Sequence, residues 1–192
     1  MGRAVTALAL AVALAGLFQL GHAGLIWSKS WVAPVLIERA WTQLQSDTAA
    51  RVTTGDYRPW PWADMAPVAR LSFPTLGRET RLALSDPSAR TMAFGPVLID
   101  GGPVPAFFGH RDTHFLLLRD IEVGDPIDWE SPDGTVRQYR VTETAIRHEA
   151  EIAVPEDTAA DRMLLVTCWP FDGWEAGGPL RFVVLADRET GT

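Results

Sequence analysis

Cys168 is the only cysteine of this 192-residue chain, and its surroundings favour a chemical role. It ends an apolar run, residues 163–168, and a loop containing proline and glycine, residues 169–178, separates it from a second apolar run that starts at Leu180. Short apolar runs bounded in this way are typical of buried strands, so the thiol is predicted to emerge where a strand ends. A thiol is a strong nucleophile only as a thiolate, and it therefore needs a basic or cationic neighbour.

Two residues are candidates for that neighbour. His110 lies in the segment 107–112, Phe-Phe-Gly-His-Arg-Asp, at a similar transition from an apolar strand to a loop. Arg181 opens the strand that follows the loop after Cys168, so it would face the thiol if the two strands are neighbours. A histidine can serve a thiol as general acid and base, and an arginine can stabilise the oxyanion of a tetrahedral intermediate. Each residue alone has an ordinary structural explanation, but together they predict nucleophilic catalysis.

A metal site is not expected. His110 and His114 have the spacing of two ligands on one face of a helix, but the glutamate of a metallohydrolase motif is absent between them. Proline and glycine precede them instead of helix-forming residues, and His148 is expected at the surface. The sequence therefore predicts neither a metal nor another cofactor.

The N-terminal segment is the second strong signal. Residues 4–27 contain no Asp, Glu, Lys or Arg, and their number is close to the ~20 that a membrane-spanning helix requires. Arg3 precedes them, which favours a cytoplasmic N-terminus and an exported domain behind the segment. We expect an uncleaved, single-pass signal anchor, and a cleaved signal peptide is the alternative. A lone cysteine in an exported chain cannot form an internal disulfide, which again favours a reactive thiol.

The composition excludes one class of partner. The formal net charge is −7, and the 17 Lys and Arg residues are scattered among 24 acidic residues without a basic run. A surface that follows a nucleic-acid backbone needs clustered cations, so nucleic-acid binding is not expected. The length suits one domain and an anchor, and a hydrophobic content of 47% is enough for a sizeable core.

Residues 30–50 are predicted to form one helix behind the anchor, with Pro34 in its first turn, where a missing N–H is tolerated. Its apolar face consists of Ile37, Ala40, Trp41 and Leu44. We expect this helix to brace the following domain. The alternative is a helix that lies on the membrane surface through Trp31 and Trp41.

The rest of the chain is predicted to be mostly β. A linker rich in proline and tryptophan, residues 55–67, leads into short β-prone runs that Gly, Pro and Asp separate. The Pro-Asp-Gly sequence at 132–134 predicts a hairpin, and residues 116–120 are expected to form a short helix. This spacing indicates an all-β barrel or sandwich. The predicted strands are 68–73, 79–84, 105–108, 126–129, 135–144, 163–168 and 180–186.

Three separate motifs carry a resemblance to a known family. The segment Leu164-Leu165-Val166-Thr167-Cys168 resembles the Thr-Leu-x-Thr-Cys signature of sortases, with Leu164 in place of the first threonine. Residues 109–115 resemble the histidine motif of that family, and residues 178–184 resemble its arginine strand. Residues 167–172, Thr-Cys-Trp-Pro-Phe-Asp, are similar to the Gram-negative, marine proteobacterial type, also called class GN. The resemblance extends over residues 68–188.

The resemblance implies an eight-stranded β-barrel with short helices, preceded by an N-terminal transmembrane helix and a helical stalk. It implies a cysteine transpeptidase that cleaves a surface protein at a C-terminal Leu-Pro-x-Thr-Gly-like sorting signal and transfers it to an amine acceptor of the cell envelope. Cys168 would form the acyl thioester, His110 would be the general acid and base, and Arg181 would hold the oxyanion or position the substrate. Thr167 and Trp169 would contact the substrate, as could Trp174.

The same resemblance places the catalytic domain on the periplasmic side of the inner membrane. Some sortases bind calcium at an acidic loop, but the acidic residues here lack the spacing of a calcium loop, and a solvated acidic face is expected instead. These acidic residues are Glu149, Glu151, Glu156 and Asp157.

The predicted organisation is an anchor over 1–28, a helical stalk and linker over 29–67, a catalytic barrel over 68–188 and a tail over 189–192. Two other functions stay open. One is an exported cysteine peptidase that transfers its acyl group to water, and the other is a non-catalytic envelope β-barrel binding module with a buried cysteine. An L,D-transpeptidase would need a Ser-x-Gly-Cys sequence, which the chain lacks.

Overall fold

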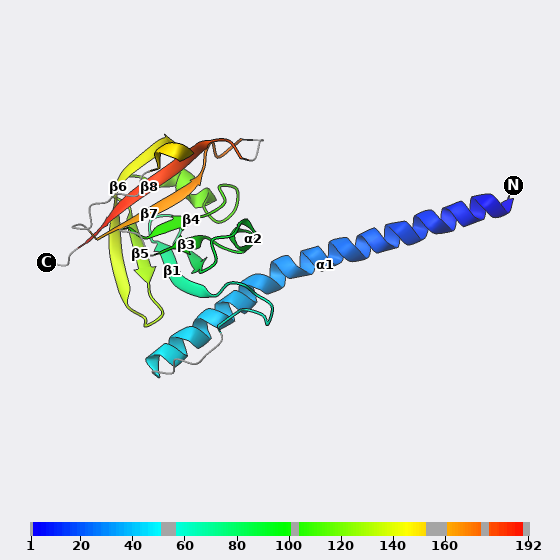
Figure 1. Ribbon diagram of the computed structural model, residues 1–192, viewed down its shortest axis with the longest axis horizontal. Helices are drawn as coiled ribbons and strands as arrows, with labels where there is room; N and C mark the ends of the chain where they lie inside the picture. The colour runs from blue at the N-terminus through cyan, green and yellow to red at the C-terminus, as the bar shows by residue number, and fades with distance from the viewer. Residues whose placement is uncertain (1, 51–56, 101–103, 153–160, 174–176, 190–192) are drawn as a thin grey trace. The chain divides into compact units, whose positions relative to one another are not determined.

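The computed structural model describes residues 2–50, 57–100, 104–152, 161–173 and 177–189. The chain divides into two compact units, residues 1–36 and residues 37–192. Figure 1 shows the long helix α1, Gly2–Ala49, and the strands and short helices of the second unit. Within the described residues, no helix has a stretch both long enough and apolar enough to cross a membrane.

Helix α1 corrects the prediction of a separate stalk helix with Pro34 in its first turn. Pro34 lies inside α1 instead. Proline fixes a backbone φ that suits a helix and removes one hydrogen-bond donor, so the chain can remain helical on both sides of it at the cost of one missing bond.

The last part of α1 belongs to the second unit and packs on it. Ile37 joins a buried cluster with Ala63, Met65, Leu84 and Val97. The same helix face buries Ala40, and Trp41 has no exposed surface. The prediction that this face braces the following domain is confirmed, and the alternative in which Trp41 contacts a membrane is wrong.

The second unit is a closed barrel whose strands follow the order β1-β2-β3-β4-β7-β8-β6-β5 among the described residues (Figure 1). Pairing of β1 with β5 closes it. Of the two architectures predicted, barrel or sandwich, the barrel is the one found. The strands are β1 Pro67–Phe73, β2 Glu79–Leu84, β3 Val97–Ile99, β4 Ala106–Phe108, β5 Pro126–Glu130, β6 Val136–His148, β7 Arg162–Cys168 and β8 Leu180–Arg188.

Short elements connect these strands. The hairpin predicted at 132–134 joins β5 to β6, and the short helix predicted at 116–120 is a 3₁₀ helix, Leu116–Asp120. A second 3₁₀ helix, Glu149–Glu151, follows β6, and α2 spans Ala89–Met92. Neither α2 nor the three-residue strand β3 was predicted.

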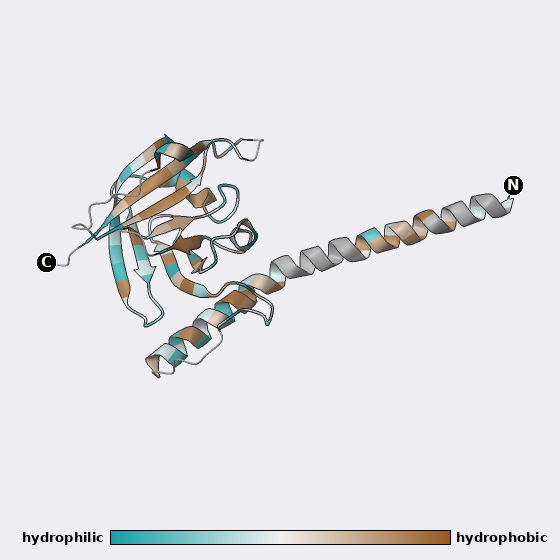
Figure 2. Ribbon diagram, in the orientation of Figure 1, coloured by the Kyte–Doolittle hydropathy of each residue, from teal (hydrophilic) through white to brown (hydrophobic). Residues whose placement is uncertain are grey.

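Strand β7 is buried on both of its faces, which explains its unbroken apolar sequence. Met163 and Leu165 point into the barrel core, with Val184 and Ala186 of β8. Leu164 and Val166 point outward, where they form a second cluster with Val104 and Ala106. Figure 2 shows hydrophobic residues along most of both β7 and β8. The outward face of this strand pair, which ends at Cys168, is therefore largely apolar.

Candidate active site

Three neighbouring strands bring the predicted residues together. Strand β4 runs parallel to β7, with Phe108 beside Val166, and the N–H of Gly109 donates to the carbonyl of Val166 at 3.2 Å. Strand β8 runs antiparallel to β7, with Arg181 directly opposite Cys168. Cys168 is thus the last residue of the central strand, β7. His110 follows the end of β4 on one side of it, and Arg181 lies at the start of β8 on the other side.

Arg181 and Cys168 share the outward face of the barrel, because side chains of directly opposite residues in an antiparallel pair point to the same side. Cys168 is a free thiol and partly exposed. The prediction that the two strands are neighbours and that Arg181 faces Cys168 is confirmed by this register.

The guanidinium of Arg181 has three hydrogen-bond acceptors. Nη2 donates to Oε2 of Glu149 at 2.5 Å, and Nη1 donates to the carbonyl of Leu180 at 3.0 Å and to the carbonyl of Gly178. The N–H of Glu149 donates to the carbonyl of Pro179 at 2.8 Å, so both backbone and side chain of Glu149 bind the start of β8. The side chain of Arg181 is 20% exposed and that of Glu149 is 54% exposed.

Sequence reasoning treated Glu149 as part of a solvated acidic face and missed its contact with Arg181. The pairing of His148 with Leu180 across β6 and β8 places Glu149 beside this arginine. A prediction of that register would have been needed to find it, because the two residues lie far apart in the sequence.

The turn that carries His110 is packed from within. Gly109 lies against the buried ring of Phe115, and a Cβ atom on Gly109 would come within 2.7 Å of Phe115 Cδ2. The N–H of Phe115 donates to the carbonyl of His110 at 2.9 Å. The glycine before the histidine is therefore required for space.

Thr167 joins the two strands that lead to the thiol and the histidine. Its side chain points inward and is 2% exposed, and its Oγ1 donates to the carbonyl of Gly109 at 2.7 Å. The hydroxyl therefore holds strand β7 to the end of β4, and it does not face a substrate.

Trp169 begins the loop after the thiol and is partly buried among aromatic rings. Its ring lies 6.0 Å from Phe182 in a stacked arrangement and 5.6 Å from Phe171 edge to face. The backbone N–H of Trp169 donates to the carbonyl of Leu180 at 3.0 Å. The loop thus starts from a fixed aromatic cluster next to Cys168, while Trp174 lies outside the described residues.

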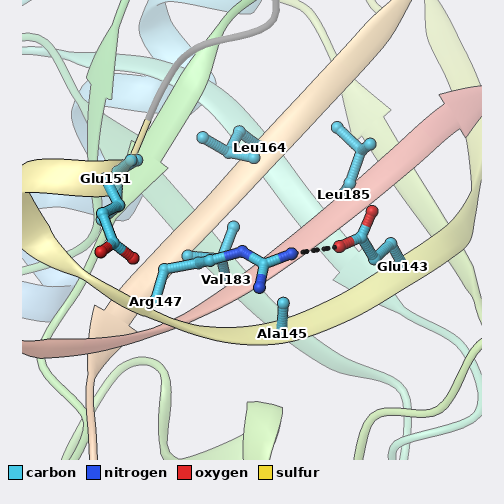
Figure 3. Close-up of a pocket in the computed structure, with 8 residues that line it drawn as sticks. Glu143, Ala145, Arg147, Glu151, Leu164, Val183 and Leu185 are labelled. Carbon is cyan, nitrogen blue, oxygen red and sulfur yellow. Dashed lines mark hydrogen bonds and ion pairs between the residues drawn. The ribbon is translucent and has the colours of Figure 1, made fainter.

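A hollow of about 190 Å³ lies on the same outward face, farther along β7 and β8 from the thiol. Its apolar lining includes Leu164, Val183 and Leu185, which alternate in step with Cys168 and Arg181. Figure 3 shows an ion pair at this hollow between Arg147 and Glu143, whose N and O atoms are 3.1 Å apart. Glu151 and Ile152, at the turn after β6, also line it.

No titratable cluster in the described part of the chain suits a metal ion. No group of three or more His, Cys, Asp or Glu side chains is arranged there to hold one. His110 and His114 are separated by turns instead of helix, and Nε2 of His114 lies 3.4 Å from the carbonyl of Ala93. Burial lowers the pKa of His114 below its ordinary value. Glu156 and Asp157 lie outside the described residues.

Residues 71–189 match the family model of the sortase domain. Since this match covers more than half of the chain, the protein belongs to the sortase family, a class of cysteine transpeptidases. No curated protein matches the sequence.

Solved sortase structures share the fold. Sortase A from Corynebacterium diphtheriae is 20% identical with a TM-score of 0.58, and the match covers 83% of this chain and 85% of that one. A sortase D5 transpeptidase from Clostridium perfringens is 12% identical with a TM-score of 0.62, covering 81% of this chain and 99% of that one. Sortase A from Listeria monocytogenes is 20% identical with a TM-score of 0.55, covering 65% and 88%.

Proposed function

We propose that this protein cleaves a C-terminal sorting signal of the Leu-Pro-x-Thr-Gly type through a thioester on Cys168 and transfers the acyl group to an amine of the cell envelope. The observation that carries this proposal is the strand order β4-β7-β8. It places Cys168 between the turn of His110 on one side and Arg181 on the other.

In the first step, the proton of the Cys168 thiol passes to His110, and Sγ attacks the carbonyl carbon of the scissile peptide bond. The carbonyl oxygen becomes an oxyanion, which the guanidinium of Arg181 stabilises as a hydrogen-bond donor. The C–N bond then breaks, and His110 gives a proton to the leaving amine, so that the acyl group remains on sulfur as a thioester.

In the second step, the nitrogen of an acceptor amine attacks the thioester carbonyl carbon. His110 takes a proton from this amine, the C–S bond breaks, and the same proton passes from His110 to the leaving sulfur, which restores the thiol. The product is a new peptide bond, and the histidine acts as acid in one step and as base in the other.

The hollow along β7 and β8 is the proposed place for the part of the signal that precedes the scissile bond. It lies on the face of the thiol, and the apolar part of its lining, Leu164, Val183 and Leu185, suits an aliphatic side chain. An extended peptide in this position would run along the strands toward Cys168.

We also propose that the chain is a Gram-negative, class GN sortase held at the inner membrane with its barrel in the periplasm. The support is the sequence: residues 4–27 carry no Asp, Glu, Lys or Arg, and Thr-Cys-Trp-Pro-Phe-Asp follows the family pattern at 167–172. The apolar side chains between Val12 and Leu20 are exposed on α1. Retention of the full-length chain in membranes after an alkaline wash would test the anchor, and release into the wash would contradict it.

The experiment that tests the reaction is product analysis. The full-length protein is incubated with Leu-Pro-x-Thr-Gly peptides, with and without glycinamide as a small amine acceptor. We expect a product in which glycinamide replaces the residues after the threonine, and no product with Cys168→Ala. Cleavage that yields only the free acid would favour an exported peptidase. Absence of cleavage, with a thiol that reacts only after denaturation, would favour a binding module.

A further inference from the structure

Arg111, the residue after His110, is a buried charged side chain. It is 9% exposed, and the other buried polar residues in the described part of the chain, Thr91 and Thr167, carry no charge. Its Nη2 donates to the carbonyl of Gly173 at 2.7 Å. Gly173 belongs to the loop that begins directly after Cys168, so this bond connects the turn of the histidine to the loop of the thiol.

The fit between Arg111 and Gly173 is close. A Cβ atom on Gly173 would lie 2.9 Å from Nη1 and 3.2 Å from Nη2 of Arg111. The backbone φ of Gly173 is outside the left-handed region, so an alanine there would act by pushing the guanidinium aside and not through backbone strain. The guanidinium therefore packs directly against the backbone of Gly173.

Burial of a guanidinium is costly unless its donors are satisfied, and the bond to Gly173 satisfies one of them beside His110. The strand pairing fixes only the ends of β4 and β7. Cys168 is the last residue of β7 and is still paired with Arg181, whereas His110 lies beyond the end of β4, so strand pairing alone does not hold the imidazole against the thiol. A contact between the turn of His110 and the loop that follows Cys168 can do so. Arg111 makes such a contact.

We propose that Arg111 is a positioning residue: by holding Gly173 it fixes the loop after Cys168 against the turn of His110 and so sets the distance between thiol and imidazole. The inference rests on the proposed function, in which His110 serves Cys168. A lysine in this position keeps the charge but has a single ammonium in place of the planar guanidinium, so it should hold the loop less well.

The single cysteine makes the test direct, because alkylation of the full-length chain by iodoacetamide reports Cys168 alone. The alkylation rate is measured against pH for the wild type, His110→Ala, Arg111→Lys and Gly173→Ala. We expect the Arg111→Lys and Gly173→Ala profiles to move from the wild-type profile most of the way to that of His110→Ala. The rate of Leu-Pro-x-Thr-Gly peptide cleavage should fall about tenfold or more, chiefly in kcat, since displacements near 1 Å can cost up to ~100-fold.

Arg162→Lys is the matched control, because Arg162 binds Asp187 at 2.9 Å at the other end of β7. Its alkylation profile should stay that of the wild type. If His110→Ala shifts the profile but folded Arg111→Lys and Gly173→Ala do not, the inference is wrong while the proposed function stands. If His110→Ala leaves the profile unchanged, the proposed pairing of thiol and histidine fails. Loss of the fold in both test variants would assign the contact to stability and overturn the positioning role.

Discussion

The two sides of the thiol are held in different ways. On the β4 side, buried contacts fix the turn of His110: the Thr167 hydroxyl on the Gly109 carbonyl, and the Phe115 ring on Gly109. On the β8 side, Arg181 donates to the carbonyls of Leu180 and Gly178 and to the carboxylate of Glu149, and this carboxylate is 54% exposed. Buried hydrogen bonds are costly to lose, whereas exposed ion pairs contribute little, so the β4 side should be the more rigid one.

This difference suits the proposed chemistry. Proton transfer between thiol and imidazole depends steeply on distance and needs a fixed pair. The arginine must donate to a substrate carbonyl that enters and leaves, and an exposed carboxylate partner that water can replace allows the guanidinium to adjust. The contrast predicts that changes on the β4 side have larger effects than changes on the β8 side.

The largest effect is expected from Gly109→Ala. The added methyl group would lie within 2.7 Å of the buried Phe115 ring, and overpacking of this kind costs about 1–3 kcal/mol of stability. Because His110 is the next residue, peptide cleavage should also fall, by about 100-fold. Denaturant unfolding and cleavage rates measure the two effects. Adding Phe115→Leu should restore part of both, and a stable, active single variant would show that the turn is not tightly packed.

The next effect is expected from Thr167→Val, which keeps the shape of the side chain and leaves the Gly109 carbonyl without its hydroxyl donor. An unsatisfied buried acceptor costs about 1–3 kcal/mol. Thr167→Ser is the matched control, because it retains the hydroxyl. Urea denaturation should show the loss for valine and a smaller one for serine. Equal stability of the valine variant and the wild type would contradict the role of this bond.

Much of this arrangement follows from the sequence, for a physical reason. Cys168, His110 and Arg181 each stand at the end or the beginning of an apolar run, and alternation along those runs predicts the shared face of the thiol and the arginine. The contacts that Glu149 makes with Arg181 and Gly173 makes with Arg111 were missed, because the first depends on the register of β6 on β8 and the second on the packing of two loops. Strand β3 has only three residues, too few to show an alternation of apolar and polar side chains. The sequence placed Pro34 in the first turn of a helix instead of inside one, because helix boundaries are where sequence patterns are weakest.

On the β8 side, Glu149→Gln should have a smaller effect. It removes the charge but keeps the size of the side chain and one oxygen acceptor, so the free energy of unfolding should change by less than about 1 kcal/mol. Cleavage should change only a few-fold, and salt should reduce the difference from the wild type. Glu79→Gln is the stability control, since Glu79 is similarly exposed at 52% and pairs with Arg81 at 2.7 Å. A loss as large as that of Thr167→Val would remove the distinction between the two sides.

The smallest effect concerns pH. Burial lowers the pKa of His114 in the folded chain below the ordinary histidine value of about 6.5. The unfolded chain therefore binds the proton more readily, and the folded state should lose stability as pH falls below about 6.5, until the folded histidine also titrates. His114→Gln should weaken this dependence in melting curves between pH 7.5 and 5.0. An unchanged dependence would show that other groups cause it.

The central claim is that Cys168 forms an acyl thioester with the help of His110 and Arg181. Intact-mass spectrometry of the full-length chain with Leu-Pro-x-Thr-Gly peptides tests it most directly. We expect a mass increase equal to the peptide fragment that ends at threonine, absent in Cys168→Ala and slower to form in His110→Ala and Arg181→Ala. No adduct with any peptide, together with a thiol that alkylates only on denaturation, would contradict it.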